Sequence, residues 1–456
     1  MKLLLIEPAN RFSISVNELH LLERIARRNY LDVPPLALGV LAALTPPEWE
    51  IKIMQEPKDT VDFNEEADLV GITAATHNVK RGYEIAGEFR KRGKKVIMGG
   101  IHPTVMPEEA LEHCDSVCIG EGEMVWREVL EDAKRGKLKK IYRSKELLDL
   151  KFYTPPRRDL MPERKAIFFN VGTLEVSRGC PYDCDFCSVS AIHGRKIRYR
   201  PTESVIQEIE SIENKNIFFV DNNIISNYQQ AKELFREMIP LKKRWTAQAT
   251  ISIVRDRELL KLASDSGCYG LLIGIESVIS EGFEKYSKSV KSLKELKEAL
   301  KLLKDHGIGV LAHMVFGNDF DTKENLKESL KNLLELDIAS ATLGIVVPYP
   351  GTKLAAELEK QNRILTKDWD YYDIHHLVFK PANFTCEEFL EEIYCLRKKF
   401  FSIFPILRRT FNYRSPLVLG INISSRAHNR VASSLLPVGV SGCKMNSSTG
   451  AIQQSG

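Results

Sequence analysis

The sequence predicts an α/β protein with two successive α/β domains and a small, mainly helical C-terminal region. Three observations support this prediction. Short apolar, strand-like runs alternate with helix-like runs over the first 140 residues. A polar stretch that carries prolines interrupts the alternation at 141–170. A second series of six strand–helix units follows from residue 171. We therefore expect a doubly wound parallel sheet followed by a partial (β/α)6 barrel.

The first domain is expected to contain five buried strands, at 3–6, 50–54, 69–73, 96–98 and 117–119. Helix-like runs lie between them, notably 79–91, which Gly93 would end, and 108–113. Short buried strands with helical crossovers build a Rossmann-like parallel sheet. Ligands bind beyond the carboxyl ends of such strands, so the segments after these strands are the expected binding site.

The second domain is expected to contain six strands, at 174–177, 217–220, 245–249, 270–275, 310–316 and 341–347. The clearest helix is 291–306, where four leucines form one apolar stripe and Gly307 follows as the expected C-cap. Its many lysines indicate a solvated outer helix and not a nucleic-acid surface. Six units suggest a partial barrel with its chemistry at the carboxyl ends of the strands.

We place the domain boundaries at 1–140, 141–170 (linker), 171–385, 386–423 (helical) and 424–456, a serine-rich tail without a regular period that we expect to be disordered. The helical region carries an apolar stripe interleaved with lysines and arginines. Its members are Phe389, Ile393, Leu396, Phe400, Phe404, Leu407 and Phe411. Such a stripe lies on a membrane surface or packs on its own domain. Pro405 interrupts the stripe, and we favour packing on the barrel.

Charge is unevenly distributed along the chain. The net charge is +4, and the segment from 393 to 456 contains nine Lys or Arg and no Asp or Glu, so residues 1–392 carry +4 − 9 = −5. The basic segment suits an acidic electron donor or an anionic membrane. We expect no membrane span, because no apolar run approaches 18 residues. Nine cysteines without an export signal indicate a reducing cytoplasm.

Three cysteines carry most of the chemical information: Cys180, Cys184 and Cys187, with Phe186 just before the last. Three thiolates hold three irons of a 4Fe–4S cluster and leave the fourth iron open to a ligand, whereas clusters that only carry electrons usually take four cysteines. The alternative is a structural zinc site. Zinc ribbons pair two Cys-x2-Cys hooks, and the sequence has no second hook.

This spacing is the signature of radical S-adenosylmethionine (SAM) enzymes, which the chain strongly resembles. The pieces PPLALGVLAAL, DLVGITAAT, VIMGGIHPTVMPEEAL and SVCIGEGE resemble the cobalamin-binding domain ahead of one class of them. The resemblance to cobalamin-binding radical SAM enzymes of the class B methyltransferase type covers residues 1 to about 385. It implies an anaerobic enzyme with a 4Fe–4S cluster, SAM and cobalamin. Its implied activity is methylation of an unactivated carbon through a 5′-deoxyadenosyl radical and methylcobalamin.

The resemblance also assigns residues to each cofactor, and it identifies no catalytic side chain. It assigns Cys180, Cys184 and Cys187 to the cluster; Phe186, Asp221, Asn222, Gln248, Glu276 and Gly317 to SAM; and Thr73, Thr76, Gly99, Gly100, His102, Glu121 and Gly122 to cobalamin. Asn222 is a departure, since related enzymes more often have aspartate there. The stretch EPANRFSISV after the first strand lacks the histidine of the Asp-x-His-x-x-Gly motif. We therefore expect no protein histidine below the cobalt, which favours its reduced, four-coordinate state.

The substrate stays open between a peptide, a lipid or terpenoid, and another metabolite. The main alternative activity is radical oxidation or ring closure of the magnesium-porphyrin cyclase type. A cobalamin or redox sensor without turnover is a third interpretation, and the open iron of the cysteine motif argues against it. The expected partner is a small electron donor such as ferredoxin or flavodoxin, with a weak membrane contact through the basic C-terminal region as a further alternative. Nucleic acid is not expected.

Overall fold

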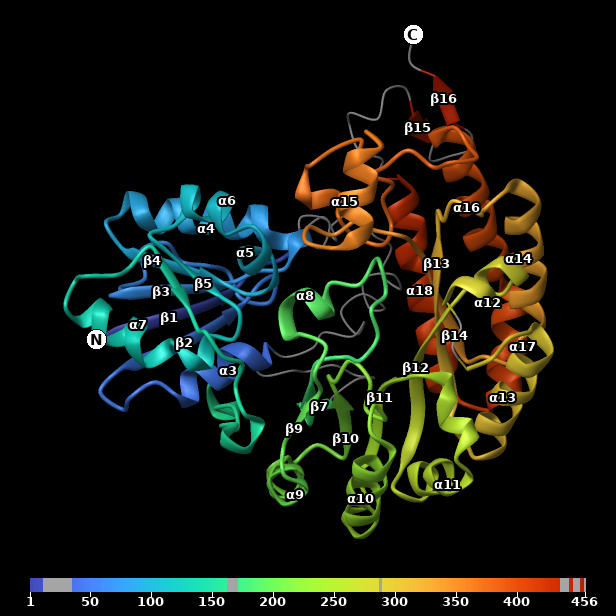
Figure 1. Ribbon diagram of the computed structural model, residues 1–456, viewed down its shortest axis with the longest axis horizontal. Helices are drawn as coiled ribbons and strands as arrows, with labels where there is room; N and C mark the ends of the chain where they lie inside the picture. The colour runs from blue at the N-terminus through green and yellow to red at the C-terminus, as the bar shows by residue number, and fades with distance from the viewer. Residues whose placement is uncertain (11–34, 162–170, 287–288, 435–442, 446–451, 455–456) are drawn as a thin grey trace.

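The computed structural model describes residues 1–10, 35–161, 171–286, 289–434, 443–445 and 452–454. Over these ranges the chain forms two α/β domains that lie side by side, with C-terminal helices on the far side of the second domain (Figure 1). Three predicted segments lie partly outside the described residues. These are 11–16 of the stretch after the first strand, 162–170 of the linker and most of the tail beyond 434.

The first domain contains a six-stranded parallel sheet with strand order β2-β1-β3-β4-β5-β6. The strands are β1 (Lys2–Glu7), β2 (Glu50–Gln55), β3 (Leu69–Thr73), β4 (Lys95–Gly99), β5 (Ser116–Ile119) and β6 (Ile141–Arg143). The five predicted strands are confirmed, and the short edge strand β6 lies in the stretch predicted as linker. The strand order reverses between β1 and β3, which is where doubly wound sheets bind their ligands.

Helices cover both faces of this sheet because its strands are apolar on both sides. Alternate residues of β1 enter different cores: Leu4 and Ile6 pack in one, Leu3 and Leu5 in the other. The helices are α3 (Leu36–Ala43), α4 (Val79–Lys91), α5 (Ile101–Val105), α6 (Pro107–His113) and α7 (Trp126–Lys134). Helix α4 ends as predicted, just before Gly93, whose φ of 75° suits glycine.

The second domain is a six-stranded parallel sheet with order β14-β13-β12-β11-β10-β7, so β14 and β7 form its two edges. The strands are β7 (Val171–Leu174), β10 (Asn216–Phe219), β11 (Arg244–Ala249), β12 (Cys268–Glu276), β13 (Gly309–Phe316) and β14 (Ser340–Ile345). The outer helices are α9 (Thr202–Ser211), α10 (Tyr228–Met238), α11 (Arg257–Asp265), α13 (Leu293–Asp305), α14 (Lys323–Glu335) and α15 (Lys353–Lys360). The predicted partial barrel and the helix ending at Gly307 are confirmed.

The inner and outer faces of this barrel differ in burial. In β13 the residues that face the outer helices are buried, and those between them keep accessible surface. The half-buried inner positions include Thr246 and Gln248 on β11, Leu272 on β12, Leu311, His313 and Val315 on β13, and Thr342 on β14. His313 is flanked in the register by Gly274 and Thr342. The inner face therefore mixes apolar and polar side chains, with small neighbours beside one imidazole.

Three helices follow the barrel: α16 (Cys386–Phe400), α17 (Ile403–Tyr413) and α18 (Pro416–Ser434). The predicted stripe packs on the barrel only along α16, where Phe389, Ile393, Leu396 and Phe400 are buried. On α17 the prediction is wrong, because Phe404, Leu407 and Phe411 are exposed. The chain starts a new helix after Ser402, with Pro405 in its first turn, and this resets which face meets the barrel.

Two further observations concern the end of the chain. Helix α18 includes residues 424–434, for which the sequence predicted an irregular tail; Ser424 and Ser425 are buried there. Beyond it, β15 (Cys443–Met445) pairs antiparallel with β16 (Ile452–Gln454). Among the described residues, no helix has the combined length and apolarity that crossing a bilayer requires.

Candidate active site

A cavity of about 430 Å³ lies where the carboxyl ends of β1, β3, β4 and β5 face the second domain. The first domain contributes the segments after these strands and part of α3 to its wall. The second domain contributes Glu175, Arg178, Ile192, His193 and Val220. The cavity therefore lies at the switch point of the sheet and next to the first strands of the barrel.

Five of the seven residues predicted for cobalamin line this cavity: Thr73, Gly99, Gly100, Glu121 and Gly122. The other two, Thr76 and His102, are buried beside it and contact each other, with 3.3 Å between the threonine Oγ1 and the imidazole Nδ1. The imidazole Nε2 lies 3.3 Å from Glu109 Oε1. Thr76 and His102 therefore join the loops after β3 and β4 without lining the cavity.

The floor of the cavity fits a large, flat ligand. Gly100 has a φ of 97°, and a Cβ there would lie 2.8 Å from the backbone N and O of Ala74, so only glycine allows β4 to end this close to the β3 loop. Gly120 has a φ of 82°, and a Cβ there would project into open space. Apolar side chains of Leu38, Ile97 and Ile101 line the rest. A mostly apolar cavity with glycine-rich strand ends suits a corrin ring.

Among the described residues, two histidines line the cavity, His77 and His193. Burial lowers the pKa of His77, which keeps its imidazole neutral. His193 Nδ1 lies 3.5 Å from Glu121 Oε1. The absence of a histidine ligand below the cobalt therefore stays a prediction.

Ion pairs join the cavity wall to the barrel. Arg198 donates two hydrogen bonds to the carboxylate of Glu121, at 2.9 and 2.7 Å, and the backbone N–H of Leu148 donates another at 2.8 Å. Burial opposes ionisation of Glu121, but the hydrogen bonds from His193 and Arg198 outweigh it and hold the pKa of Glu121 far below its usual range. Arg178 pairs with Glu123 at 2.6 Å and with Glu175 at 2.9 Å. Neither arginine was predicted from the sequence.

The three cysteines lie in the loop between β8 (Ser177–Arg178) and α8 (Val189–His193). Cys184 is exposed, and Cys180 and Cys187 are half-buried. Gly179 has a φ of 97°, and a Cβ there would lie 2.5 Å from the backbone O of Lys196, so only glycine fits at the start of this loop. The described residues contain no three-residue site for a single metal ion.

The cysteine loop is fixed to two helices of the second domain, α12 (Ser280–Tyr286) and α15. The carbonyl of Asp185 accepts a hydrogen bond from Leu354 N at 2.9 Å, and Lys285 lies 3.5 Å from the Asp185 carboxylate. Phe186 packs edge-on against Tyr286, with 5.8 Å between the ring centroids. Gly317, with a φ of 100°, lies with Asp185 and Tyr286 in a small pocket of about 50 Å³. The structure thus brings Phe186 and Gly317 together beside the cysteines.

Glu276, at the end of β12, has two unusual properties. Its φ is 63°, a region that non-glycine residues rarely adopt. Its carboxylate folds over Gly274, where a Cβ would lie 2.2 Å from Oε1. Burial raises the pKa of Glu276 to about 7. No described residue donates a hydrogen bond to its carboxylate or forms an ion pair with it. A strained, desolvated acceptor without a protein donor is suited to a ligand with hydroxyl groups.

The remaining predicted SAM residues occupy different surroundings. Asp221 is fully buried and accepts hydrogen bonds from Val176 N at 3.0 Å and from Ser177 Oγ at 2.6 Å. Burial raises the pKa of Asp221 to about 7 against these hydrogen bonds. Asp221 therefore supports β8, the strand that leads into the cysteine loop. Asn222 and Gln248 are half-buried at neighbouring strand ends.

Comparison with known proteins finds that two family models match the chain. Residues 174–351 match the radical SAM superfamily, and residues 25–130 match the B12 binding domain. The chain is 30% identical over 387 residues to bacteriochlorophyllide d C-12(1)-methyltransferase of Chlorobaculum tepidum, covering 82% of this chain and 84% of that protein. It is 30% identical over 426 residues to the C-8(2)-methyltransferase of the same organism, covering 86% and 91%.

A solved structure supports the same fold. The radical SAM methyltransferase TsrM from Kitasatospora setae, with cobalamin and a 4Fe–4S cluster bound, superposes with a TM-score of 0.64 and 19% identity over 79% of this chain and 78% of that chain. A more distant match in sequence is the anaerobic magnesium-protoporphyrin IX monomethyl ester cyclase of Cereibacter sphaeroides, 26% identical over 77% of this chain and 63% of that protein.

Proposed function

The chain belongs to the cobalamin-dependent radical SAM methyltransferases, and we propose that it methylates a carbon of a largely apolar, ring-containing metabolite. The family sets its cofactors: a 4Fe–4S cluster, SAM and cobalamin. Bound together, these groups supply radical abstraction of hydrogen and transfer of a methyl group. The residues of this chain hold the groups, orient them and exclude water.

The observation that carries this function is the short path between the two sites. Arg178 lines the cavity, pairs with Glu123, and lies two residues before Cys180. The strand end that shapes the cavity therefore also starts the cysteine loop. A ligand in the cavity and a cluster on the loop would share one space at the carboxyl ends of both sheets.

Two features support an apolar, ring-containing substrate. The relatives with the highest identity reported above are named for bacteriochlorophyllide d, a ring system. The half-buried inner positions of the barrel include the apolar Leu272, Leu311 and Val315, beside polar groups such as Gln248 and His313. Burial lowers the pKa of His313, so its imidazole is neutral and suits a carbonyl or hydroxyl partner on an apolar molecule.

We also propose that Glu276 accepts hydrogen bonds from the ribose hydroxyls of SAM, and that Phe186 and Gly317 border its adenosine. The unsatisfied carboxylate of Glu276 supports this role. Its negative charge, together with the larger effect of burial, raises the pKa of the Cys187 thiol, which places the carboxylate near the cysteine loop. A hydroxyl-bearing ligand bound there would lie next to the cluster.

The enzyme needs a reductant, and we propose that a small acidic carrier such as ferredoxin or flavodoxin docks at the loop in the cytoplasm. Cys184 is exposed at this surface. The exposed cations Lys353 and Arg195 form ion pairs with the carboxylate of Asp183, the residue before Cys184, at 2.7 and 3.3 Å. A basic rim around an exposed cluster ligand suits an acidic partner. Free thiols at this surface also suit a reducing compartment.

The proposed function is tested under anaerobic conditions. The protein is reconstituted with cluster and cobalamin and given a reductant, methyl-deuterated SAM and separate chlorophyllide, terpenoid and peptide fractions. Joint formation of 5′-deoxyadenosine and S-adenosylhomocysteine, with deuterium in a ring-containing product, supports it. Deuterium in a peptide contradicts the substrate class. 5′-Deoxyadenosine without methyl transfer indicates the cyclase-type oxidation, and neither product indicates a sensor.

A further inference from the structure

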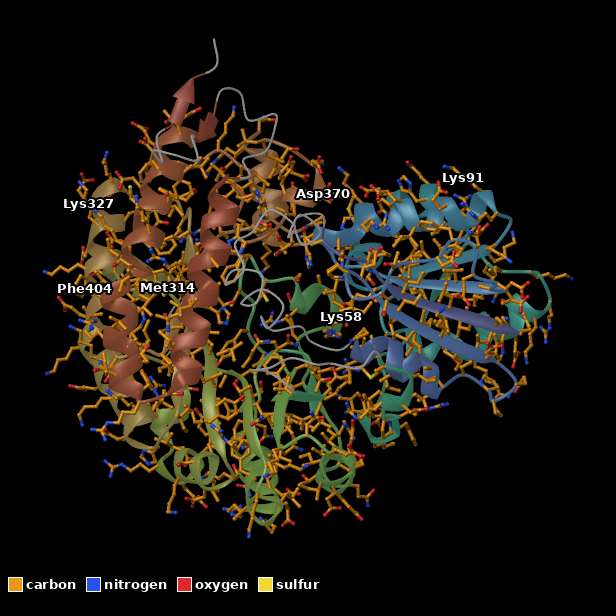
Figure 2. The ribbon with its side chains drawn as sticks, turned by 180° about the vertical axis from the view of Figure 1, so that it is seen from behind. Lys58, Lys91, Met314, Lys327, Asp370 and Phe404 are labelled. Atoms are coloured by element: carbon orange, nitrogen blue, oxygen red, sulfur yellow. The ribbon has the colours of Figure 1, made fainter. Side chains whose placement is uncertain are left out.

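Helix α17 presents an apolar face that no described part of the chain covers. Phe404 is 85% exposed, Phe411 74%, Ile403 61% and Leu407 40%. At about 100° per residue, these four side chains fall within an arc of about 100° on one side of the helix. Figure 2 shows Phe404 on the outer surface of the second domain.

The opposite side of α17 is firmly packed. Ile406 is buried, and Arg409 donates hydrogen bonds to Asn422 Oδ1 and to the carbonyl of Phe400, both at 3.0 Å. Tyr413 donates to the carbonyl of Asp337 at 2.8 Å. The helix therefore has a fixed orientation, and its four apolar side chains point outward because the other face is anchored.

Basic residues surround the apolar face. Arg408 lies beside it on α17, Arg414 ends the helix, and Lys398 and Lys399 lie at the end of α16; all four are exposed. No Asp or Glu occurs from residue 393 to the end of the chain. An exposed apolar stripe with cations beside it and no acidic residue on its own helix is the pattern of helices that lie in the interface of an anionic membrane.

We propose that α17 is a membrane-docking helix that places its apolar face into the headgroup region of an anionic bilayer. Charge complementarity favours this occupant over a second copy of the chain, because two identical basic faces repel each other. The face lies on the C-terminal helices, away from the first domain (Figure 1). A docked enzyme would therefore keep its cavity and cysteine loop clear of the lipid. This proposal does not rest on the substrate class proposed above.

The test is flotation of the full-length protein with phosphatidylcholine vesicles, with or without about a third of phosphatidylglycerol. We expect binding only to the anionic vesicles, and weaker binding as salt is raised. A double variant that carries both Phe404→Ser and Phe411→Ser should bind the anionic vesicles about tenfold more weakly, or weaker still. Arg408→Glu should also lower it. Circular dichroism of each variant verifies the fold.

Matched controls decide the outcome. Phe152→Ser removes an aromatic side chain that is 69% exposed elsewhere, and Lys91→Glu reverses an exposed charge on α4 of the first domain, on the opposite side of the molecule (Figure 2); both should leave binding unchanged. The proposal is overturned if the protein does not float with anionic vesicles, or if the controls reduce binding as much as the α17 variants. It is also overturned if the α17 face instead holds two copies together, which gel filtration with and without Phe404→Ser would reveal.

Discussion

The cavity and the cysteine loop both lie where the two domains face each other, but the protein itself completes them to different degrees. In the cavity wall, Glu121 receives hydrogen bonds from Arg198 and from Leu148 N, and Arg178 pairs with three carboxylates. Beside the loop, Cys184 is exposed and Glu276 has no donor among the described residues. Ion pairs and hydrogen bonds within the protein therefore satisfy the charged groups of the cavity wall. On the loop side, the cost of burying the Glu276 carboxylate would be offset only by a bound ligand.

The largest difference between the two regions should appear when a cluster cysteine is removed. Cys184→Ala should lower bound iron and reduce 5′-deoxyadenosine formation by at least about a thousandfold, because the open-iron site depends on all three thiolates. Cobalamin binding, measured by its optical spectrum, should remain. Cys395→Ala removes another exposed thiol, on α16, and should leave both properties intact. Loss of cobalamin binding in Cys184→Ala would show that the two regions are not separate.

On the cavity side, Arg178→Met should lower both the stability of the fold and the affinity for cobalamin. This change removes a buried cation and leaves Glu123 and Glu175 without it, which should cost about 3–5 kcal/mol in the free energy of unfolding. Cobalamin affinity should fall because the cavity wall loses its link to the barrel. Denaturant unfolding and cobalamin titration measure the two effects. The control is Arg127→Met, on the exposed face of α7. Equal stability of the two variants would contradict a structural role for the Arg178 pairs.

On the loop side, Glu276→Gln should weaken SAM binding yet stabilise the protein without ligand. The pKa of Glu276 is about 7 in the folded chain against an ordinary value of 4.5. Between these values the folded chain keeps a proton that the unfolded chain has lost, so this carboxyl lowers stability as pH rises from about 4.5 to about 7. Glu276→Gln removes the titrating group, so the variant should not lose this stability. At pH 8 its free energy of unfolding should exceed that of the unchanged protein by up to about 3 kcal/mol.

Unfolding from pH 5 to 8 and SAM titration by calorimetry measure both effects of Glu276→Gln. Glu281→Gln, at an exposed position on α12 (Ser280–Tyr286), is the control and should change neither. A destabilised Glu276→Gln variant at pH 8 would mean that the carboxylate has a structural partner. The sign of the stability change therefore tells a ligand-binding carboxylate from a structural one.

The sequence predicted the elements of both regions better than their contacts. Strand 69–73 and the helix ending at Gly307 depend on local apolar spacing, which is visible in the chain. The cysteine loop was predicted from an equally local pattern, the spacing of three cysteines within eight residues. The Glu121–Arg198 pair was not, because it joins residues 77 positions apart whose separate environments look like ordinary charged loops.

Helices α16 and α17 show the same limit. Both carry the periodic apolar spacing that predicts a helix, but spacing does not say whether the apolar side meets the barrel. The break at Ser402 redirects the chain, so Phe400 is buried and Phe404 is exposed. Burial depends on the tertiary path, and that path is absent from local periodicity.

The smallest expected effect concerns the two histidines of the cavity. The stretch after β1 lacks the histidine of the ligating motif, and His77 and His193 lie on other segments. We expect electron paramagnetic resonance of bound cobalamin(II) to lack imidazole nitrogen splitting, and His77→Ala and His193→Ala to leave the spectrum unchanged. Splitting that disappears in His77→Ala would identify that neutral imidazole as the lower ligand. The cavity would then differ from the loop side in two ways. Its ion pairs are completed within the protein, and one of its own side chains would ligate the metal of its cofactor.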